Sequence, residues 1–168
     1  FQDYGHSHWR DSLFFGSNVT NVTITGQGVI DGNSHLATGQ PKSGDACRMF
    51  GIVSSSHITI ENVALRNGGW FTLLATNIST LTITGIDLHA ARDALDIVSC
   101  RHVSIDNVNI YGGGDDAVVL KSDFSVGEAL DSFDINVTNS HIGSAGCNAL
   151  QFGSETVGNF YGIKFENL

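Results

Sequence analysis

The feature that most limits the fold is a repeat of short runs that alternate β-branched and polar residues. One such run is "LTITGIDL", whose Ile83 lies 23 residues after Ile60 and 22 residues before Ile105. Each isoleucine occupies the same position in its run, and Asn or Gly follows each run. Later copies anchored at Val137 and Phe165 follow at spacings of 32 and 28 residues, which indicates loops inserted between repeats.

This self-similarity, without any helical periodicity, predicts a β-solenoid, in which equivalent residues stack at about 4.8 Å. We therefore expect an all-β, right-handed parallel β-helix, with the handedness taken from the resemblance described below. An immunoglobulin-like sandwich is the alternative, but it requires hairpin signals every ~8–12 residues that the sequence does not repeat. We expect residues 1–168 to form one such domain, a central portion of a longer helix truncated at both ends.

Composition excludes several classes of function. The chain has 17 acidic and 8 basic residues and a formal net charge of −9, which argues against a nucleic-acid partner. No apolar stretch approaches the ~18 residues of a membrane span, so we expect no membrane contact. We also expect the protein to be a monomer. Cys47, Cys100 and Cys147 form no CxxC pair, and we expect them to be small buried side chains.

The repeat also predicts which polar residues stack. The segments "GWFTLLAT", "RDALDIVS", "DDAVVLKS" and "CNALQFGS" align through their apolar positions. Their second positions then form one row of Trp70, Asp93, Asp116 and Asn148, with Asp115 beside Asp116. We therefore expect three carboxylates from neighbouring repeats to share one small patch.

Three interpretations of this patch remain open on the residues alone. Close carboxylates can divide into a protonated acid and an ionised base, as a glycosidase requires. They could instead help to bind calcium, which takes six to eight oxygen ligands. They could also be a structural ladder of aspartates bonded to turn amides. Residues 112–114, all glycine, loosen the backbone before the acid pair, and whether Lys121 reaches the patch stays open.

At this point the motifs resemble a known family. The stretches "SLFFGSNVTNVTITGQGVIDG", "RDALDIVSCRHVSIDNVNIYGGGDDAVVLKS" and "GCNALQFGSE" are similar, in the right order, to family 28 glycoside hydrolases. These are the polygalacturonases and rhamnogalacturonan-degrading enzymes of the pectinase-like β-helix superfamily. The resemblance implies hydrolysis of a pectin-type polysaccharide with inversion, and secretion or a periplasmic location. It implies that Asp115 is the general acid, while Asp93 and Asp116 hold and deprotonate the attacking water.

The chain also departs from the family pattern. Asn148 stands where the family has a histidine, and Arg92 stands where the family has a threonine before the aspartate. We expect substrate contacts from Trp70, Arg92, Lys121 and Asn148, and we expect neither a metal nor a cofactor. The segment "YGHSHWRDS" from residue 4 is expected to pack against the first repeat.

Two other functions remain as alternatives. A non-catalytic β-helix could bind polysaccharide, as adhesins and tailspikes do. A polysaccharide lyase would require calcium and a basic residue as proton acceptor. The substrate itself is open, because anionic galacturonan needs cationic subsites, whereas a rhamnose-containing chain of low charge does not.

Overall fold

The structure is a computed structural model that describes residues 6–39, 46–143 and 146–168, and every regular element in this part is a β-strand. The strands are β1 (Ser12–Ser17), β2 (Thr20–Thr25), β3 (Val29–Asp31), β4 (Arg48–Glu61), β5 (Ala64–Arg66), β6 (Phe71–Thr84), β7 (Asp87–Ala90), β8 (Asp93–Val98), β9 (Arg101–Asp106), β10 (Asn109–Gly112), β11 (Val118–Ser122), β12 (Ser132–Thr138), β13 (His141–Ile142), β14 (Leu150–Thr156) and β15 (Phe160–Glu166). Alternation of β-branched and polar residues favours this outcome, because such side chains fit a pleated surface with one buried face.

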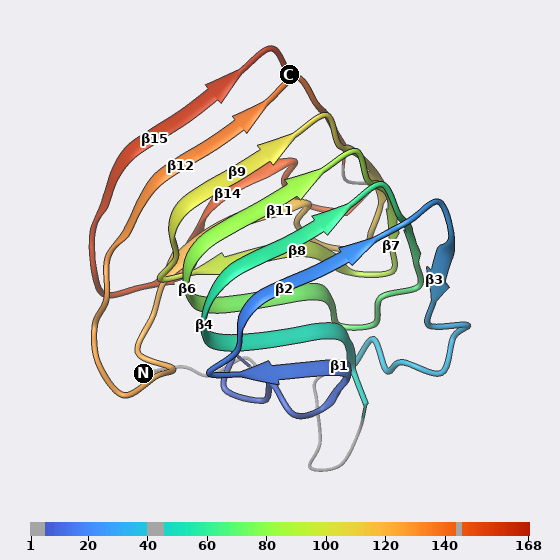
Figure 1. Ribbon diagram of the computed structural model, residues 1–168, viewed down its shortest axis with the longest axis horizontal. Helices are drawn as coiled ribbons and strands as arrows, with labels where there is room; N and C mark the ends of the chain where they lie inside the picture. The colour runs from blue at the N-terminus through green and yellow to red at the C-terminus, as the bar shows by residue number, and fades with distance from the viewer. Residues whose placement is uncertain (1–5, 40–45, 144–145) are drawn as a thin grey trace.

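The strands form a ten-stranded and a five-stranded sheet, and the pairs in both are parallel. The chain visits the two sheets in turn, so that each repeat lies beside the previous one (Figure 1). Strand pairing joins Ile60 to Ile83, Ile83 to Ile105, Ile105 to Val137 and Val137 to Phe165. The predicted repeat and its parallel, all-β character are thus confirmed.

The large sheet curls because the chain bends at the same place in successive repeats. Ser54, Asn77 and Ser99 have φ values of 49°, 52° and 53°, in the left-handed region that most residues avoid. Their neighbours pair directly, since Val53 lies opposite Thr76 and Thr76 lies opposite Val98. A left-handed residue at the same level of these three repeats bends them in the same way, so this part of the sheet curves around the core.

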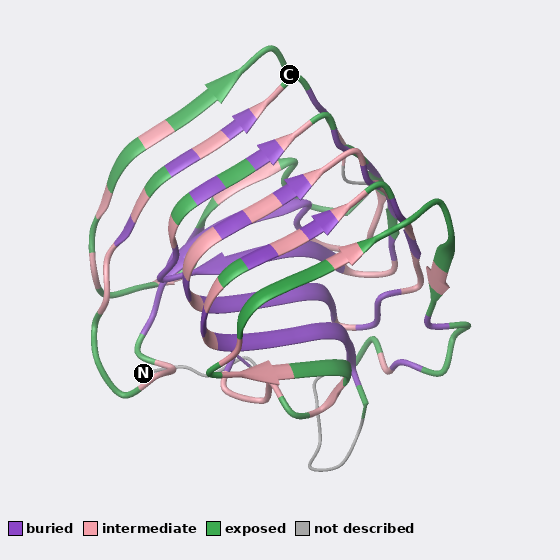
Figure 2. Ribbon diagram, in the orientation of Figure 1, coloured by how far each residue is buried: buried purple, intermediate pink, exposed green. Residues whose placement is uncertain are grey.

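That core is a set of apolar columns that run through the stack. Leu73, Leu95 and Val118 lie opposite one another on β6, β8 and β11, and all three are buried. Figure 2 shows burial concentrated on the central strands, with exposed positions on β1, β2 and β15 at the two ends of the stack. Two of the strands at the site described below, β8 and β11, are buried along their whole length.

The cysteine expectation is correct for two residues and wrong for one. Cys47 and Cys100 are buried, whereas Cys147 is exposed, because it belongs to the exposed stretch 146–149 that precedes β14. Within the part of the chain that the structure describes, no disulfide joins any two of them. The described residues include no long apolar helix that could cross a membrane.

The bends generate a first prediction, at Asn107. This residue lies between β9 and β10 and has a φ of 51°. The residue before it, Asp106, pairs with Thr84, so Asn107 lies at the level of Gly85 in the neighbouring repeat. Asn107→Val should lower the free energy of unfolding by about 1–2 kcal/mol, because a β-branched side chain is strained in the left-handed region. Asn107→Gly should change it by less than ~0.5 kcal/mol. Urea denaturation measures both, and equal losses would show that the backbone angle does not matter there.

Candidate active site

The three predicted carboxylates do meet. Asp93 begins β8 and Asp116 lies two residues before β11, and these strands are neighbours in the large sheet. The amide of Ala94 donates a hydrogen bond of 3.1 Å to the carbonyl of Asp116, which brings the two aspartates to the same level. Asp93, Asp115 and Asp116 line one cavity of about 350 Å³. Asp93 and Asp116 are buried, and the side chain of Asp115 is 28% exposed.

One part of the predicted row is wrong. Phe71, and not Trp70, lies opposite Asp93, and Leu74 lies opposite Asp96. Three consecutive apolar residues at 73–75 carry no alternation, so the sequence allowed this strand to be aligned one residue out of register. Trp70 instead contacts Arg92, and both line the cavity.

Arg92 is the cation in closest contact with the carboxylates. Its guanidinium carbon lies 3.8 Å from the centroid of the Trp70 ring. Its Nη2 donates a hydrogen bond to Oδ2 of Asp115, and its Nη1 lies 3.3 Å from Oδ1 of Asp93. The guanidinium thus bridges carboxylates from two adjacent repeats.

Asn148 fixes the third carboxylate. Its backbone amide and its Nδ2 donate hydrogen bonds of 2.9 and 3.0 Å to Oδ1 of Asp116. In the orientation that lets its nitrogen donate, the Gln151 amide lies 3.0 and 2.9 Å from the two oxygens of Asp116. Asn148, at the family's histidine position, therefore supplies hydrogen-bond donors but no titratable group.

A buried cluster of charges next to the cavity was not predicted from the sequence. The Nζ of Lys121 lies 3.3 Å from Oδ1 of Asp96, 3.0 Å from Oε2 of Glu155 and 2.8 Å from Nε2 of His6. Nδ1 of His6 in turn lies 3.0 Å from Oδ2 of Asp123. Lys121 does line the cavity, but carboxylates already surround its ammonium group.

Apart from Lys121, only one member of this cluster left a signal in the sequence. Leu95 and Ile97 belong to the core, so strand alternation turns Asp96 to the opposite face, where the cavity lies. Glu155 and His6 come from a strand end and from the N-terminal segment, and only the folded chain brings them to Lys121.

The N-terminal segment crosses several repeats and not only the first. His6 is buried against Phe71, with ring centroids 5.5 Å apart. Nε1 of Trp9 donates a hydrogen bond of 2.9 Å to Oγ1 of Thr76 on β6. The segment thus covers part of the outward face of the sheet, beside the cavity. The first two residues of "YGHSHWRDS" lie outside the described residues.

Burial separates the proton affinities of these groups. Burial, and then the charge of Asp96, raise the pKa of Asp93 to about 9, although Arg92 acts in the opposite direction. Burial also raises the pKa of Asp96, against the effect of Lys121. Burial alone would lower the pKa of Lys121, but Asp96 and Glu155 outweigh it, so this pKa is raised. Near neutral pH the site therefore contains a protonated Asp93 beside a charged Lys121.

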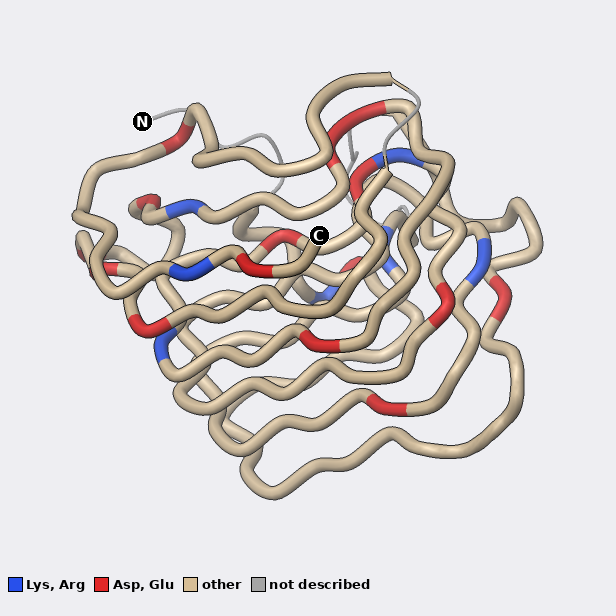
Figure 3. Tube along the Cα trace, turned by 90° about the horizontal axis from the view of Figure 1, so that it is seen from above, with Lys and Arg blue, Asp and Glu red and all other residues tan. Residues whose placement is uncertain are grey.

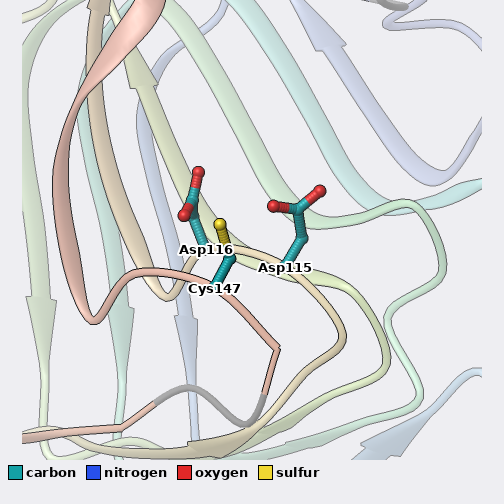
Figure 4. Close-up of side chains that lie close together, drawn as sticks. All are labelled: Asp115, Asp116 and Cys147. Atoms are coloured by element: carbon teal, nitrogen blue, oxygen red, sulfur yellow. The ribbon is translucent and has the colours of Figure 1, made fainter.

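Asp115, Asp116 and Cys147 could together approach a cation, since one ligand atom of each lies within 4.8 Å of the others (Figure 4). Three ligands are fewer than the six to eight oxygens that calcium takes or the four ligands of a structural zinc site. Oxygens of Asp115 and Asp116 already accept hydrogen bonds from Arg92 and Asn148. The described residues thus offer an incomplete metal site.

Comparison with known proteins gives one match. The family model described as glycosyl hydrolases family 28 matches residues 2–166. This range includes Asp93, Asp115 and Asp116 and the residues that contact them. No curated protein and no solved structure matches the chain.

The raised pKa of Asp93 generates a prediction about stability. Between about pH 4 and pH 9 the folded protein holds a proton at Asp93 that the unfolded chain releases, so this group destabilises the folded state increasingly as pH rises. Asp93→Asn should therefore raise the free energy of unfolding relative to the unaltered protein, and more at pH 8 than at pH 5, with a difference of at least about 1 kcal/mol. Urea denaturation at both pH values measures this.

Asp31→Asn is the control for this experiment. Hydrogen bonds from Asn67 and Asn33 lower the pKa of Asp31, so its carboxylate is ionised at both pH values. Its effect on the free energy of unfolding should not change between pH 5 and pH 8. The account of Asp93 is wrong if the two variants show the same pH dependence.

Proposed function

Since the chain belongs to the glycosyl hydrolases family 28, we propose that it hydrolyses glycosidic bonds of a polysaccharide at the cavity lined by Asp93, Asp115 and Asp116. The observation that carries this proposal is the meeting of three carboxylates in one cavity, at the start of the adjacent parallel strands β8 and β11. In this proposal the stacked repeats are the coils of a right-handed parallel β-helix. The protein is secreted or acts in the periplasm.

Inverting hydrolysis divides the work between an acid and a base. Asp115 gives its proton to the leaving oxygen, and its side chain is the one that a substrate can reach, being 28% exposed against 5% for Asp93. Asp116 takes a proton from water while the water oxygen forms the new bond to the anomeric carbon. Asp93, which holds a proton near neutral pH, donates a hydrogen bond that orients this water.

Charge in and around the cavity favours a substrate of low charge. The two cations that line it, Arg92 and Lys121, already pair with carboxylates. Figure 3 shows acidic positions interspersed with the basic ones along the described trace. Of the pectin-type polymers, a rhamnogalacturonan-like chain therefore suits this cavity better than fully ionised galacturonan. Asn148, which lines the cavity, is the proposed contact for its uncharged hydroxyl groups.

The same pairing weighs against the lyase alternative. Elimination needs a basic side chain that accepts a proton from the sugar. Lys121 has a raised pKa, which makes it a poor proton acceptor near neutral pH. Arginine is effectively always protonated, so Arg92 is a poor acceptor as well.

Substitution of the acid and the base should affect two kinds of substrate differently. Asp115→Asn should slow hydrolysis of the natural polysaccharide by about 10²- to 10⁴-fold, because it removes the proton donor. An aryl glycoside with a good leaving group needs little protonation, so its rate should fall far less. Asp116→Asn should slow both substrates alike, because it removes the base that activates water. Steady-state rates on the two substrates measure these effects.

The same assay separates the roles of the carboxylates from the function as a whole. If Asp93→Asn is the variant that an activated leaving group rescues, Asp93 is the acid and the assignment of Asp115 is wrong. If all three variants retain full activity, the carboxylates are structural and hydrolysis at this cavity is excluded.

A further inference from the structure

Arg92 occupies an unusual place for a residue that could bind substrate. Its side chain is 25% exposed and is enclosed by protein on two sides. One face of the guanidinium lies 3.8 Å from the centre of the Trp70 ring, and its edge is directed at Asp115 and Asp93. Nη2 donates a hydrogen bond to Asp115, whereas Nη1 lies 3.3 Å from Oδ1 of Asp93 as an ion-pair contact.

This arrangement exploits the shape of the guanidinium group. Its planar fork presents N–H groups in fixed directions, and its flat face stacks on an indole ring through a cation–π contact. Asp93 and Asp115 belong to different repeats, and Arg92 contacts the carboxyl groups of both. A rigid cation between them holds the two carboxyl groups at one separation and in one orientation.

We propose that Arg92, backed by Trp70, is a positioning residue that holds Asp115 and Asp93 in their working geometry, and that it acts through these carboxylates without contacting the substrate. This inference rests on the proposed function, because it concerns the geometry of the same reaction. It differs from the expectation that Arg92 contacts the substrate, and the two roles predict different kinetics.

The chain offers a matched control in Arg66. Arg66 pairs with Asp87 as Arg92 pairs with Asp115, its side chain is also 25% exposed, and its guanidinium lies 5.8 Å from the ring centre of Tyr111. Arg66 belongs to β5 in the five-stranded sheet, away from the residues that line the cavity. Arg66→Gln thus removes an equivalent partly exposed ion pair without touching the site.

The test compares Arg92→Gln, Arg92→Lys and Arg66→Gln in steady-state hydrolysis of the polysaccharide that the unaltered protein cleaves. Misplacement of a catalytic group by about 1 Å can cost up to ~10²-fold in rate. We therefore expect Arg92→Gln to lower kcat by about 10- to 100-fold with KM changed by less than about twofold. Arg92→Lys should rescue little, since an ammonium group lacks the planar fork. Arg66→Gln should leave both constants unchanged.

Trp70 provides a second, independent check. If Trp70 acts only by stacking on Arg92, Trp70→Leu should lower kcat when Arg92 is present. The same substitution should not lower kcat further in the Arg92→Gln variant. Additive losses in this double-mutant cycle would contradict the proposal, because Trp70 would then have its own role. A rise in KM with unchanged kcat in Arg92→Gln would also overturn it, and would assign Arg92 to substrate binding.

A readout without activity keeps this inference separate from the proposed function. Carboxyl carbon NMR of aspartate-labelled protein follows the titration of Asp93 directly. We expect Arg92→Gln to shift the titration midpoint of Asp93 upward, because Arg92 opposes the rise in this pKa, and Arg66→Gln to leave it unchanged. An unchanged midpoint in Arg92→Gln would contradict the contact between Arg92 and Asp93. If the unaltered protein cleaves no polysaccharide, the proposed function fails while this measurement still decides whether Arg92 controls Asp93.

Discussion

Parallel pairing of one repeat with the next is the constraint on which the rest of the molecule depends. It places every residue about 4.8 Å from its counterpart on the neighbouring strand, so a polar residue at one position meets whatever occupies that position in the next repeat. Asp93 and Asp116 are brought together in this way, as are Leu95 and Val118 in the core below them. The same pairing that builds the core thus also gathers the carboxylates.

Such stacking has a cost at the site, because like charges in a buried row repel. The protein offsets this cost in three ways. Arg92 pairs with Asp115 and Asp93, Asn148 donates two hydrogen bonds to Asp116, and Asp93 retains a proton near neutral pH. A buried Lys121 similarly offsets Asp96. Asp93 thus stays protonated within the row near neutral pH, in the form that can donate a hydrogen bond to the attacking water of the proposed reaction.

The repeat made the all-β fold, the parallel register and the meeting of Asp93 with Asp116 predictable from the sequence, because alternation and spacing are local signals. The position of Trp70 was not predictable, since the uniformly apolar residues 73–75 fit two registers equally well. The cluster around Lys121 was also missed. His6 lies 115 residues before Lys121 in the sequence, and no periodic pattern predicts a contact between residues so far apart.

The central claim is that the carboxylates of this cavity hydrolyse a pectin-type polysaccharide. The most direct measurement is product analysis after incubation of the protein with a panel of such polysaccharides, beside an Asp116→Asn control. Hydrolysis predicts new reducing ends of inverted anomeric configuration by NMR, and their loss in the control. Unsaturated ends that absorb in the ultraviolet would indicate elimination, and binding without any product would indicate an adhesin-like protein. Either of these results would contradict the account.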